Sequence, residues 1–207
     1  MGVMPPRRLA GAKPVASELI ETDIERVLFS CEDIRERTQI LGEEISRDYA
    51  EHGCGADALG RPPIIVCVLR GALLFMSDLA RSIPIHMEYD FICVASYGNG
   101  TSPGAVRLIK DLESPIRGRD ALIVEDIVDT GHTLSYLRRG LEAREPASIR
   151  VCTLLDKPSR RELAIEVDYV GFTLTGNDFV VGYGMDYRGL YRNLPYIGVL
   201  KPEAIHD

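Results

Sequence analysis

The residues with the clearest chemical potential lie between positions 125 and 133 and comprise three carboxylates and two hydroxyls. Glu125 and Asp126 are adjacent at the end of an apolar run, where carboxylates can accept hydrogen bonds from a vicinal diol or bind a divalent metal ion. Residues 129–133, Asp-Thr-Gly-His-Thr, predict a short turn that opens a helix. Backbone N–H groups at such a turn bind phosphate. The stretch therefore predicts a phosphate site beside a site for a diol or a metal ion.

A purely structural interpretation of the same residues is that Asp129 or Thr130 caps the helix while the two acids face solvent. The acidic pair directly upstream makes the phosphate site the better interpretation. Two other phosphate motifs are excluded: no Gly-Lys-Ser/Thr follows, and Tyr187 stands where a dinucleotide fingerprint beginning at Gly182 needs its third glycine.

The flanking sequence predicts elements that can position these residues. Ser30 and Asp33 resemble a capping box, and apolar residues at three- and four-residue steps predict a helix that ends before Gly53. Short apolar or alternating runs predict strands at 64–69, 87–95, 106–112, 121–124 and 149–155, and helices at 71–81 and 133–143.

Strands that alternate with helices at this spacing predict an α/β protein with a mostly parallel sheet. Three further strand-like runs, 169–174, 179–183 and 196–200, are expected as edge strands or a small cap. The Gly-rich segment 98–104 is a candidate mobile loop. In open α/β sheets ligands bind beyond the carboxyl ends of the strands, which is where the acidic pair is expected.

Length and charge narrow the class of protein. With 207 residues, we expect a flexible N-terminal arm at 1–18 and one domain at 19–207. The 24 Lys and Arg against 31 Asp and Glu give a net charge of −7, the wrong sign for a general nucleic-acid or membrane binder. A secretion signal and a run of ~20 apolar residues are both absent, so a cytoplasmic protein is expected.

The five cysteines form no Cys-x-x-Cys pair. Cys67, Cys93 and Cys152 lie inside apolar runs and are expected to be buried as small hydrophobic residues rather than to bind metal or form disulfides.

Residues 124–131, Val-Glu-Asp-Ile-Val-Asp-Thr-Gly, resemble the phosphoribosyl-pyrophosphate motif of the type I phosphoribosyltransferases, especially those acting on hypoxanthine and guanine. Further matches run from about Ile64 to Arg192. The resemblance implies a central, mostly parallel twisted sheet flanked by helices, with a small hood formed from terminal segments. It also implies purine salvage: the phosphoribosyl group passes from phosphoribosyl pyrophosphate to hypoxanthine or guanine, giving IMP or GMP and pyrophosphate, with Mg²⁺ as cofactor. The implied protein is a homodimer or homotetramer with no nucleic-acid or membrane partner.

The resemblance assigns roles in the phosphoribosyl site. Glu125 and Asp126 would hold the ribose hydroxyls, and the turn would bind the 5′-phosphate. Asp129 would also be the general base near purine N7, where removing a proton makes the nitrogen a better nucleophile. The implied phosphoribosyl-binding residues are Glu125, Asp126, Asp129, Thr130, Gly131, His132 and Thr133. His132 occupies a variable position and is expected to be solvated, without a catalytic role.

Other matches imply the pyrophosphate site. Leu69, Arg70 and Gly71 resemble a loop in which the family has a cis peptide, and Arg192 would bind pyrophosphate beside it. The structural alternative is an ordinary strand-to-helix turn. Ser96 and Tyr97 resemble the start of the flexible loop that closes over the reaction centre.

The resemblance also implies the purine and metal sites. Lys157 matches the base-selecting lysine; an ammonium group can only donate, which suits a 6-oxo group and disfavours a 6-amino group. Phe179 would stack on the purine, and the backbone of Val180 would contact the base edge. The implied purine-binding residues are Lys157, Phe179, Val180 and Asp186, and the residues implied near Mg²⁺ are Glu125, Asp126 and Asp186.

Two departures from the family pattern leave the preference among hypoxanthine, guanine and xanthine open. Arg70 stands where some relatives have lysine, and Gly184-Met185 precede Asp186 in place of bulkier pairs. A different class, a phosphoribosyltransferase-like RNA-binding regulator that senses nucleotides, is the alternative, and the net acidity argues against it. A phosphate-accepting receiver domain fits less well, because its acidic pair lies near the N-terminus of a shorter chain.

Overall fold

The computed structural model describes residues 22–51, 61–96 and 106–205. The expected N-terminal arm at 1–18, the candidate loop at 98–104 and Tyr97 lie outside the described residues.

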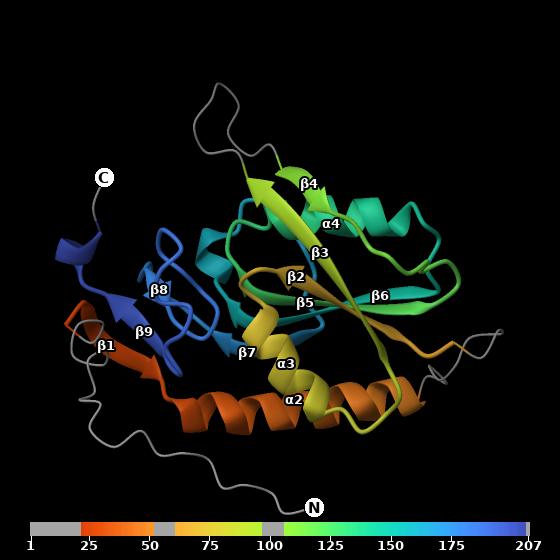
Figure 1. Cartoon of the computed structure of the whole chain (residues 1–207), viewed down its shortest axis with the longest axis horizontal. Helices are drawn as coiled ribbons and strands as arrows, with labels where there is room; N and C mark the ends of the chain where they lie inside the picture. Colours follow the sequence, from red (N-terminus) through yellow and green to blue (C-terminus); the bar gives the residue numbers. More distant parts are fainter. Residues whose placement is uncertain (1–21, 52–60, 97–105, 206–207) are drawn as a thin grey trace, which may run out of the picture.

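The main layer is a six-stranded sheet in the order β4-β3-β2-β5-β6-β7 (Figure 1). Every neighbouring pair is parallel except β3 and β4, which are antiparallel. The strands are β2 (Ile64–Leu69), β3 (Glu88–Ser96), β4 (Val106–Lys110), β5 (Asp120–Val128), β6 (Ser148–Asp156) and β7 (Tyr169–Thr173). The expected α/β class with a mostly parallel sheet is confirmed.

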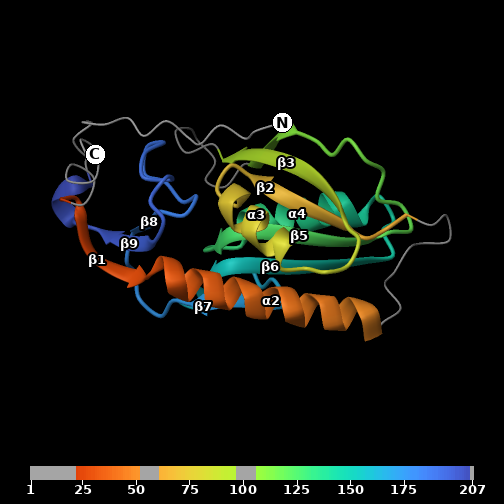
Figure 2. The same ribbon diagram turned by 60° about the horizontal axis from the view of Figure 1, so that its bottom comes forward.

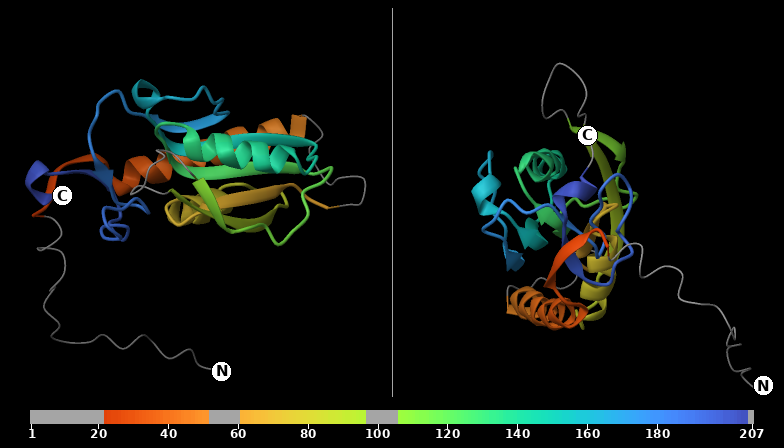
Figure 3. Two further views of the ribbon diagram at one scale, coloured as in Figure 1. Left: turned by 90° about the horizontal axis from the view of Figure 1, so that it is seen from above. Right: turned by 90° about the vertical axis from the view of Figure 1, so that its left-hand side faces the viewer.

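Helices cover both faces of this sheet (Figure 3). α2 (Cys31–Glu51) and α3 (Leu73–Arg81) pack on one face, and α4 (His132–Glu142) packs on the other. Strand β2 is apolar throughout because alternate side chains serve the two faces: Cys67 joins the core under α2 and α3, whereas Val66 joins the core under α4.

The capping box predicted for α2 is confirmed. The Ser30 N–H donates to Asp33 Oδ2 at 2.8 Å, and the Asp33 N–H donates to Ser30 Oγ at 3.1 Å. The helix then buries one apolar stripe, which includes Ile34, Leu41 and Ile45, against the sheet.

Strand β5 is longer than the predicted 121–124. It pairs with β2 on one side and with β6 on the other, and the β6 pairing continues from Asp120 to Val128. Glu125 and Asp126 therefore lie within the strand rather than beyond its end. The apolar run predicted too short a strand, because Glu125, Ile127 and Val128 remain paired with β6 beyond it.

A second, three-stranded antiparallel sheet forms the hood, in the order β1-β9-β8 (Figure 2). Its strands are β1 (Ile24–Phe29), β8 (Val180–Val181) and β9 (Ile197–Leu200). The sequence did not predict β1, and only two residues of the run predicted at 179–183 form a strand. That run ends because Gly182, Tyr183 and Gly184 all have positive φ angles, of 100°, 48° and 102°.

Burial of the cysteines matches the expectation in part. Cys67 and Cys152 are buried, whereas Cys93 is only partly buried because β3 lies next to the edge strand β4. In the described part of the chain, no helix combines the length and apolar character needed to span a membrane.

Candidate active site

The carboxyl groups of Glu125 and Asp126 lie in surroundings that disfavour their ionised form. Glu125 is 7% exposed, and Oε2 of its carboxyl has no hydrogen-bond partner among the described residues. Burial raises the pKa of Glu125 well above its usual range, and the neighbouring charge of Asp126 raises it further. A ligand that brings hydroxyl donors or positive charge would satisfy this carboxyl group.

Burial also raises the pKa of Asp126, to about 6. Backbone hydrogen bonds, including one from the Ile127 N–H at 2.8 Å, and the nearby Arg192 oppose that rise. Asp186 adds a like charge on this side of Asp126. The structure therefore brings Asp126, Asp186 and Arg192 close to one another.

The turn at 129–133 forms a cavity of about 240 Å³ at the start of α4. Gly131 has a φ angle of 90° and precedes the first residue of the helix. The back of the turn is held by the segment after β6, because Thr130 O accepts hydrogen bonds from the N–H groups of Glu162 and Leu163 at 3.0 and 3.1 Å. The predicted residues that line this cavity are Glu125, Asp126, Asp129, Thr130, Gly131 and Thr133.

His132 lies at the outer side of the turn. Its Nε2 is 2.7 Å from Glu162 Oε2, and it does not line the cavity. The His132 side chain is 37% exposed, so it contacts solvent as well as Glu162 on the segment that backs the turn.

A second cavity, of about 270 Å³, adjoins the first and shares Asp126, Ile127 and Asp129 with it. The predicted residues that line it are Asp126, Asp129, Lys157, Phe179, Val180 and Asp186. These residues come from β5, from the end of β6 and from the hood, so the topology brings distant segments of the chain to one place.

Lys157 is buried in the wall of this second cavity, with 5% of its surface exposed. Its Nζ donates to the carbonyl of Asp178 at 2.7 Å, and burial lowers its pKa while the negative charge of Asp129 opposes that effect. Phe179 is 42% exposed and meets Tyr187 edge to face, so much of its ring remains accessible. The cavity thus offers a buried cation and an exposed aromatic ring.

Asp129 lies at the junction of the two cavities. Its Oδ1 is 2.8 Å from Nε of Arg160, which belongs to the 3-10 helix η1 (Pro158–Arg160). The sequence did not single out Arg160, nor Asn177 and Asp178, which also line the second cavity. The one signal for Arg160 was its spacing three residues after Lys157.

The segments expected to bind pyrophosphate lie beside Asp126. The Leu69–Arg70 peptide bond is cis, and Arg70 is exposed. A Cβ atom on Gly71 would lie 1.6 Å from Asp126 Oδ2, so only glycine fits there. Arg192 forms an ion pair with Asp186, with 2.5 Å between Nη2 and Oδ1. Strand β3 ends at Ser96, the start of the predicted flexible loop.

The donors present fit Mg²⁺ held jointly with a substrate. Among the described residues, no group of three or more His, Cys, Asp or Glu side chains could hold a metal ion alone. Mg²⁺ is commonly bound by one or two carboxylates together with phosphate oxygens and water, and the unpartnered oxygen of Glu125 and the raised pKa of Asp126 suit such a cation.

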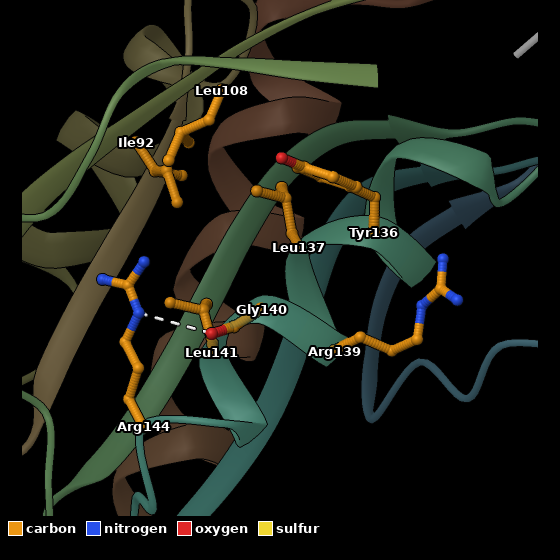
Figure 4. Close-up of a pocket in the computed structure, with 8 residues that line it drawn as sticks. All are labelled: Ile92, Leu108, Tyr136, Leu137, Arg139, Gly140, Leu141 and Arg144. Carbon is orange, nitrogen blue, oxygen red and sulfur yellow. Dashed lines mark hydrogen bonds between the residues drawn. The ribbon is translucent and has the colours of Figure 1, made fainter. Parts of the chain in front are cut away.

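A third cavity, of about 440 Å³, lies between α4 and the β3–β4 pair and is larger than either of these (Figure 4). Its lining includes apolar Ile92, Leu108 and Leu137 and no carboxylate. The charged groups at this groove are Arg139 and Arg144, and Arg144 Nε donates to the Gly140 carbonyl at 3.3 Å. None of the predicted site residues lines it, so size does not identify the active site here.

Comparison with known proteins agrees with this geometry. A family model described as a phosphoribosyl transferase domain matches residues 38–188. The hypoxanthine-guanine phosphoribosyltransferase of Streptococcus thermophilus is 47% identical over 186 residues, which are 89% of this chain and 98% of that protein. The crystal structure of a hypoxanthine phosphoribosyltransferase from Staphylococcus aureus superposes with a TM-score of 0.83 at 44% identity, covering 93% of this chain and 100% of the other.

A longer relative is also similar. The bifunctional protein TilS/HprT of Listeria innocua is 50% identical over 192 residues, which are 92% of this chain and 28% of that protein. This chain therefore spans little more than a quarter of the length of such relatives. The matched family model, the identity over most of the chain and the shared fold together establish that this protein belongs to the phosphoribosyltransferase family, among the hypoxanthine-guanine phosphoribosyltransferases.

Proposed function

We propose that this protein transfers the phosphoribosyl group of phosphoribosyl pyrophosphate to the 6-oxopurines hypoxanthine and guanine, releasing pyrophosphate. The observation that carries the proposal is the pair of adjoining cavities that share Asp126 and Asp129. One cavity offers a phosphate-binding turn and the other a buried lysine and an accessible aromatic ring. Such a pair of cavities suits a sugar phosphate in one and a flat base in the other, with the reacting carbon and nitrogen atoms held close together where the cavities adjoin.

At the sugar end, the backbone N–H groups of the turn bind the 5′-phosphate, with the hydroxyls of Thr130 and Thr133 beside them. Glu125 and Asp126 accept hydrogen bonds from the ribose hydroxyls. Both carboxyl groups have raised pKa values in the free protein, which means that their ionised forms are disfavoured there. Hydrogen bonds from the ribose hydroxyls would stabilise these ionised forms.

At the pyrophosphate end, Arg192 and the loop containing Leu69, Arg70 and Gly71 bind the leaving group. Asp126 and Asp186, with Glu125, are the carboxylates that would hold Mg²⁺ together with the substrate, and the ion would supply charge neutralisation for that group. Arg192 pairs with Asp186 in the free protein, so its guanidinium group is held on the side of the site where pyrophosphate would bind.

At the purine end, Lys157 donates a hydrogen bond to the 6-oxo group, Phe179 stacks on the ring, and the backbone of Val180 contacts its edge. Asp129 accepts the proton from the purine ring nitrogen as the new bond to the anomeric carbon forms. Its ion pair with Arg160 holds the carboxylate at the junction of the cavities.

The decisive experiment measures pyrophosphate release with phosphoribosyl pyrophosphate, Mg²⁺ and each of hypoxanthine, guanine, xanthine, adenine and uracil. We expect release with hypoxanthine or guanine and little with adenine or uracil. Absence of release with every 6-oxopurine would reject the proposed activity. The homodimer or homotetramer expected from the family remains a prediction, which sedimentation of the protein would test.

The role of Asp129 has its own test. We expect Asp129→Asn to lower turnover by about 10²- to 10⁴-fold, the usual contribution of a general base, while the Kd for phosphoribosyl pyrophosphate changes much less. Asparagine keeps the shape of the side chain but cannot accept the purine proton. Single-turnover rates and calorimetric binding would be compared, and an equal loss in both would make Asp129 a positioning residue instead.

A further inference from the structure

A buried tyrosine connects the hood to the helix that follows the Leu69–Gly71 loop. Tyr183 is 7% exposed, and its hydroxyl donates to Asp78 Oδ2 on α3. The other carboxylate oxygen of Asp78 pairs with Arg81 on the same helix. Tyr183 lines neither of the two cavities of the active site. The hydrogen bond therefore joins two parts of the fold without reaching a substrate.

The turn that contains Tyr183 also carries the polar groups of the pyrophosphate side. The Gly184 N–H donates to the Arg192 carbonyl at 3.0 Å, and the Arg192 side chain donates back to the Gly184 carbonyl. Arg192 in turn pairs with Asp186. The position of Gly184, the residue next to Tyr183, therefore fixes the positions of both Arg192 and Asp186.

Asp78, the partner of Tyr183, lies on the helix that directly follows the Leu69–Gly71 loop. Helix α3 begins at Leu73, two residues after Gly71. The turn at residues 182–185, which we call the hood turn, follows β8, and its Gly184 packs against Gly71 just before α3. The Tyr183–Asp78 hydrogen bond thus spans the two segments to which pyrophosphate binding is assigned.

The two segments touch closely. A Cβ atom on Gly184 would lie 2.0 Å from the Gly71 carbonyl oxygen, and a Cβ atom on Gly71 would lie 1.6 Å from Asp126 Oδ2. The Leu69–Gly71 loop is therefore packed tightly between the hood turn on one side and Asp126 of β5 on the other. Because catalysis is sensitive to displacements of about 1 Å, the spacing of this stack matters for binding the leaving group.

Tyr183 itself has a backbone conformation that side chains other than glycine rarely adopt, with a φ angle of 48°. Such a residue keeps this conformation only where its surroundings hold it. The burial of its ring in the main core, together with its hydroxyl bond to Asp78, provides that hold.

We propose that Tyr183 is a positioning residue for the pyrophosphate half of the reaction. Its hydroxyl bond to Asp78 holds the turn with Asp186 and Arg192 against the Leu69–Gly71 loop. This role rests on the proposed function. It acts through Gly184 and does not involve contact with either substrate.

The test removes only the hydroxyl, with Tyr183→Phe. We expect the KM for phosphoribosyl pyrophosphate, and for pyrophosphate in the reverse reaction, to rise about 3- to 10-fold, the effect of one lost hydrogen bond. The KM for hypoxanthine should change less than about twofold, because the purine contacts assigned to Lys157, Phe179 and Val180 come from residues outside the turn that Tyr183 holds.

Tyr169→Phe is a matched control. Tyr169 is also buried, its hydroxyl also donates to an aspartate, Asp48, at 3.0 Å, and it lies on β7 rather than near the site. We expect this variant to lose stability without any change in KM. If the two variants lose stability equally and both keep wild-type KM values, the proposed role of Tyr183 is wrong.

Asp78 provides a second test. Asp78→Asn keeps an oxygen that can accept the Tyr183 hydroxyl, so its KM values should stay near those of the wild type. Asp78→Ala should reproduce the effect of Tyr183→Phe, and the double variant Tyr183→Phe/Asp78→Ala should show no further increase. Additive effects in the double variant would overturn the proposal.

A binding measurement separates this role from the proposed activity. If the wild-type protein releases no pyrophosphate with any purine, the proposed function fails, and calorimetry with Mg²⁺-pyrophosphate then tests the positioning role alone. Weaker binding by Tyr183→Phe than by Tyr169→Phe would support the role, and equal binding would reject it.

Discussion

The carboxyl groups of Glu125 and Asp126 are placed where the folded protein disfavours their charge. Burial is the main cause in both, and it raises the pKa of Asp126 to about 6. Residues arranged for binding rather than for stability commonly destabilise the free protein. Ionised Glu125 and Asp126 therefore lower the stability of the free protein while they serve to bind the ligand.

Asp126→Asn tests this opposition. Asp126 has a higher pKa in the folded protein than the usual value, so its ionisation destabilises the fold as pH rises from about 4 through about 6. We expect the variant to increase the free energy of unfolding at pH 7.5 by about 1 to 3 kcal/mol and to change it little at pH 4. Urea melts at the two pH values measure this.

Asp33→Asn is the control for the sign of that effect. Hydrogen bonds from Ser30 lower the pKa of Asp33, so ionisation of this exposed carboxyl group favours the folded state. The control should therefore lose stability at pH 7.5. A gain of similar size in both variants would show that net charge, and not the environment of Asp126, is responsible.

Lys157 is the residue that should decide between purines. We expect Lys157→Gln to lower kcat/KM for hypoxanthine by about 10-fold to 10²-fold, because a hydrogen bond from a charged donor is lost. Adenine should be used relatively better, since the glutamine oxygen can accept a hydrogen bond from a 6-amino group. Steady-state kinetics with both bases test this, and unchanged discrimination would assign selectivity to another group.

At the same scale, the sequence located the acids, the turn and the lysine but not their environments. Lys157 follows a strand and resembles a surface residue by type, yet it is buried because the chain at Asp178 returns over it. The ion pair of Asp129 with Arg160 likewise depends on how η1 folds back. Contacts of this kind depend on tertiary structure, which a local pattern does not contain.

At the scale of elements, Gly71 and Gly184 let the Leu69–Gly71 loop lie between strand β5 and the hood, because neither has a side chain. We expect Gly71→Ala to reduce turnover by more than about 10²-fold, because its Cβ atom would overlap Asp126 Oδ2 and displace either the loop or the carboxylate. Turnover and circular dichroism would be measured together, so that loss of activity can be separated from loss of fold.

Gly140→Ala is the control for that substitution. Gly140 lies within α4, and a Cβ atom there would meet nothing within 4 Å. Alanine should leave turnover unchanged and stabilise the helix by about 0.5 to 1 kcal/mol. Retained activity in Gly71→Ala would mean that the close packing of the loop is dispensable.

The elements differ in how well the sequence predicted them. Helix α2 and strand β2 were predicted within a residue or two, because a capping box and a wholly apolar run are strong local signals. Strand β1 was missed because all of its residues are exposed or half-buried, and its strand partner among the described residues is the distant β9. Hood strands owe their structure to pairing across the chain, so their own residues carry little signal.

At the scale of the whole molecule, the site is assembled from the sheet and the hood together. A ligand that contacts both should therefore stabilise the entire fold. At about 100 times its Kd, phosphoribosyl pyrophosphate with Mg²⁺ should add about 2.7 kcal/mol and raise Tm by several degrees. A chelator should remove most of this shift, because the carboxylates near the pyrophosphate side then face its charge unshielded. Equal protection with and without Mg²⁺ would contradict this arrangement.

Asp126 belongs to the shared wall of the two cavities, and this has a consequence for inhibitor design. A compound that links a base mimic to a phosphate mimic must pass this carboxylate, whose neighbours Glu125 and Ile127 are both paired with β6. A linker with an ammonium group or paired hydroxyls at its midpoint would be complementary there, whereas a plain alkyl linker would cover the acid without giving it a donor or a positive charge. Affinity should therefore depend more on the chemistry of the linker than on its length.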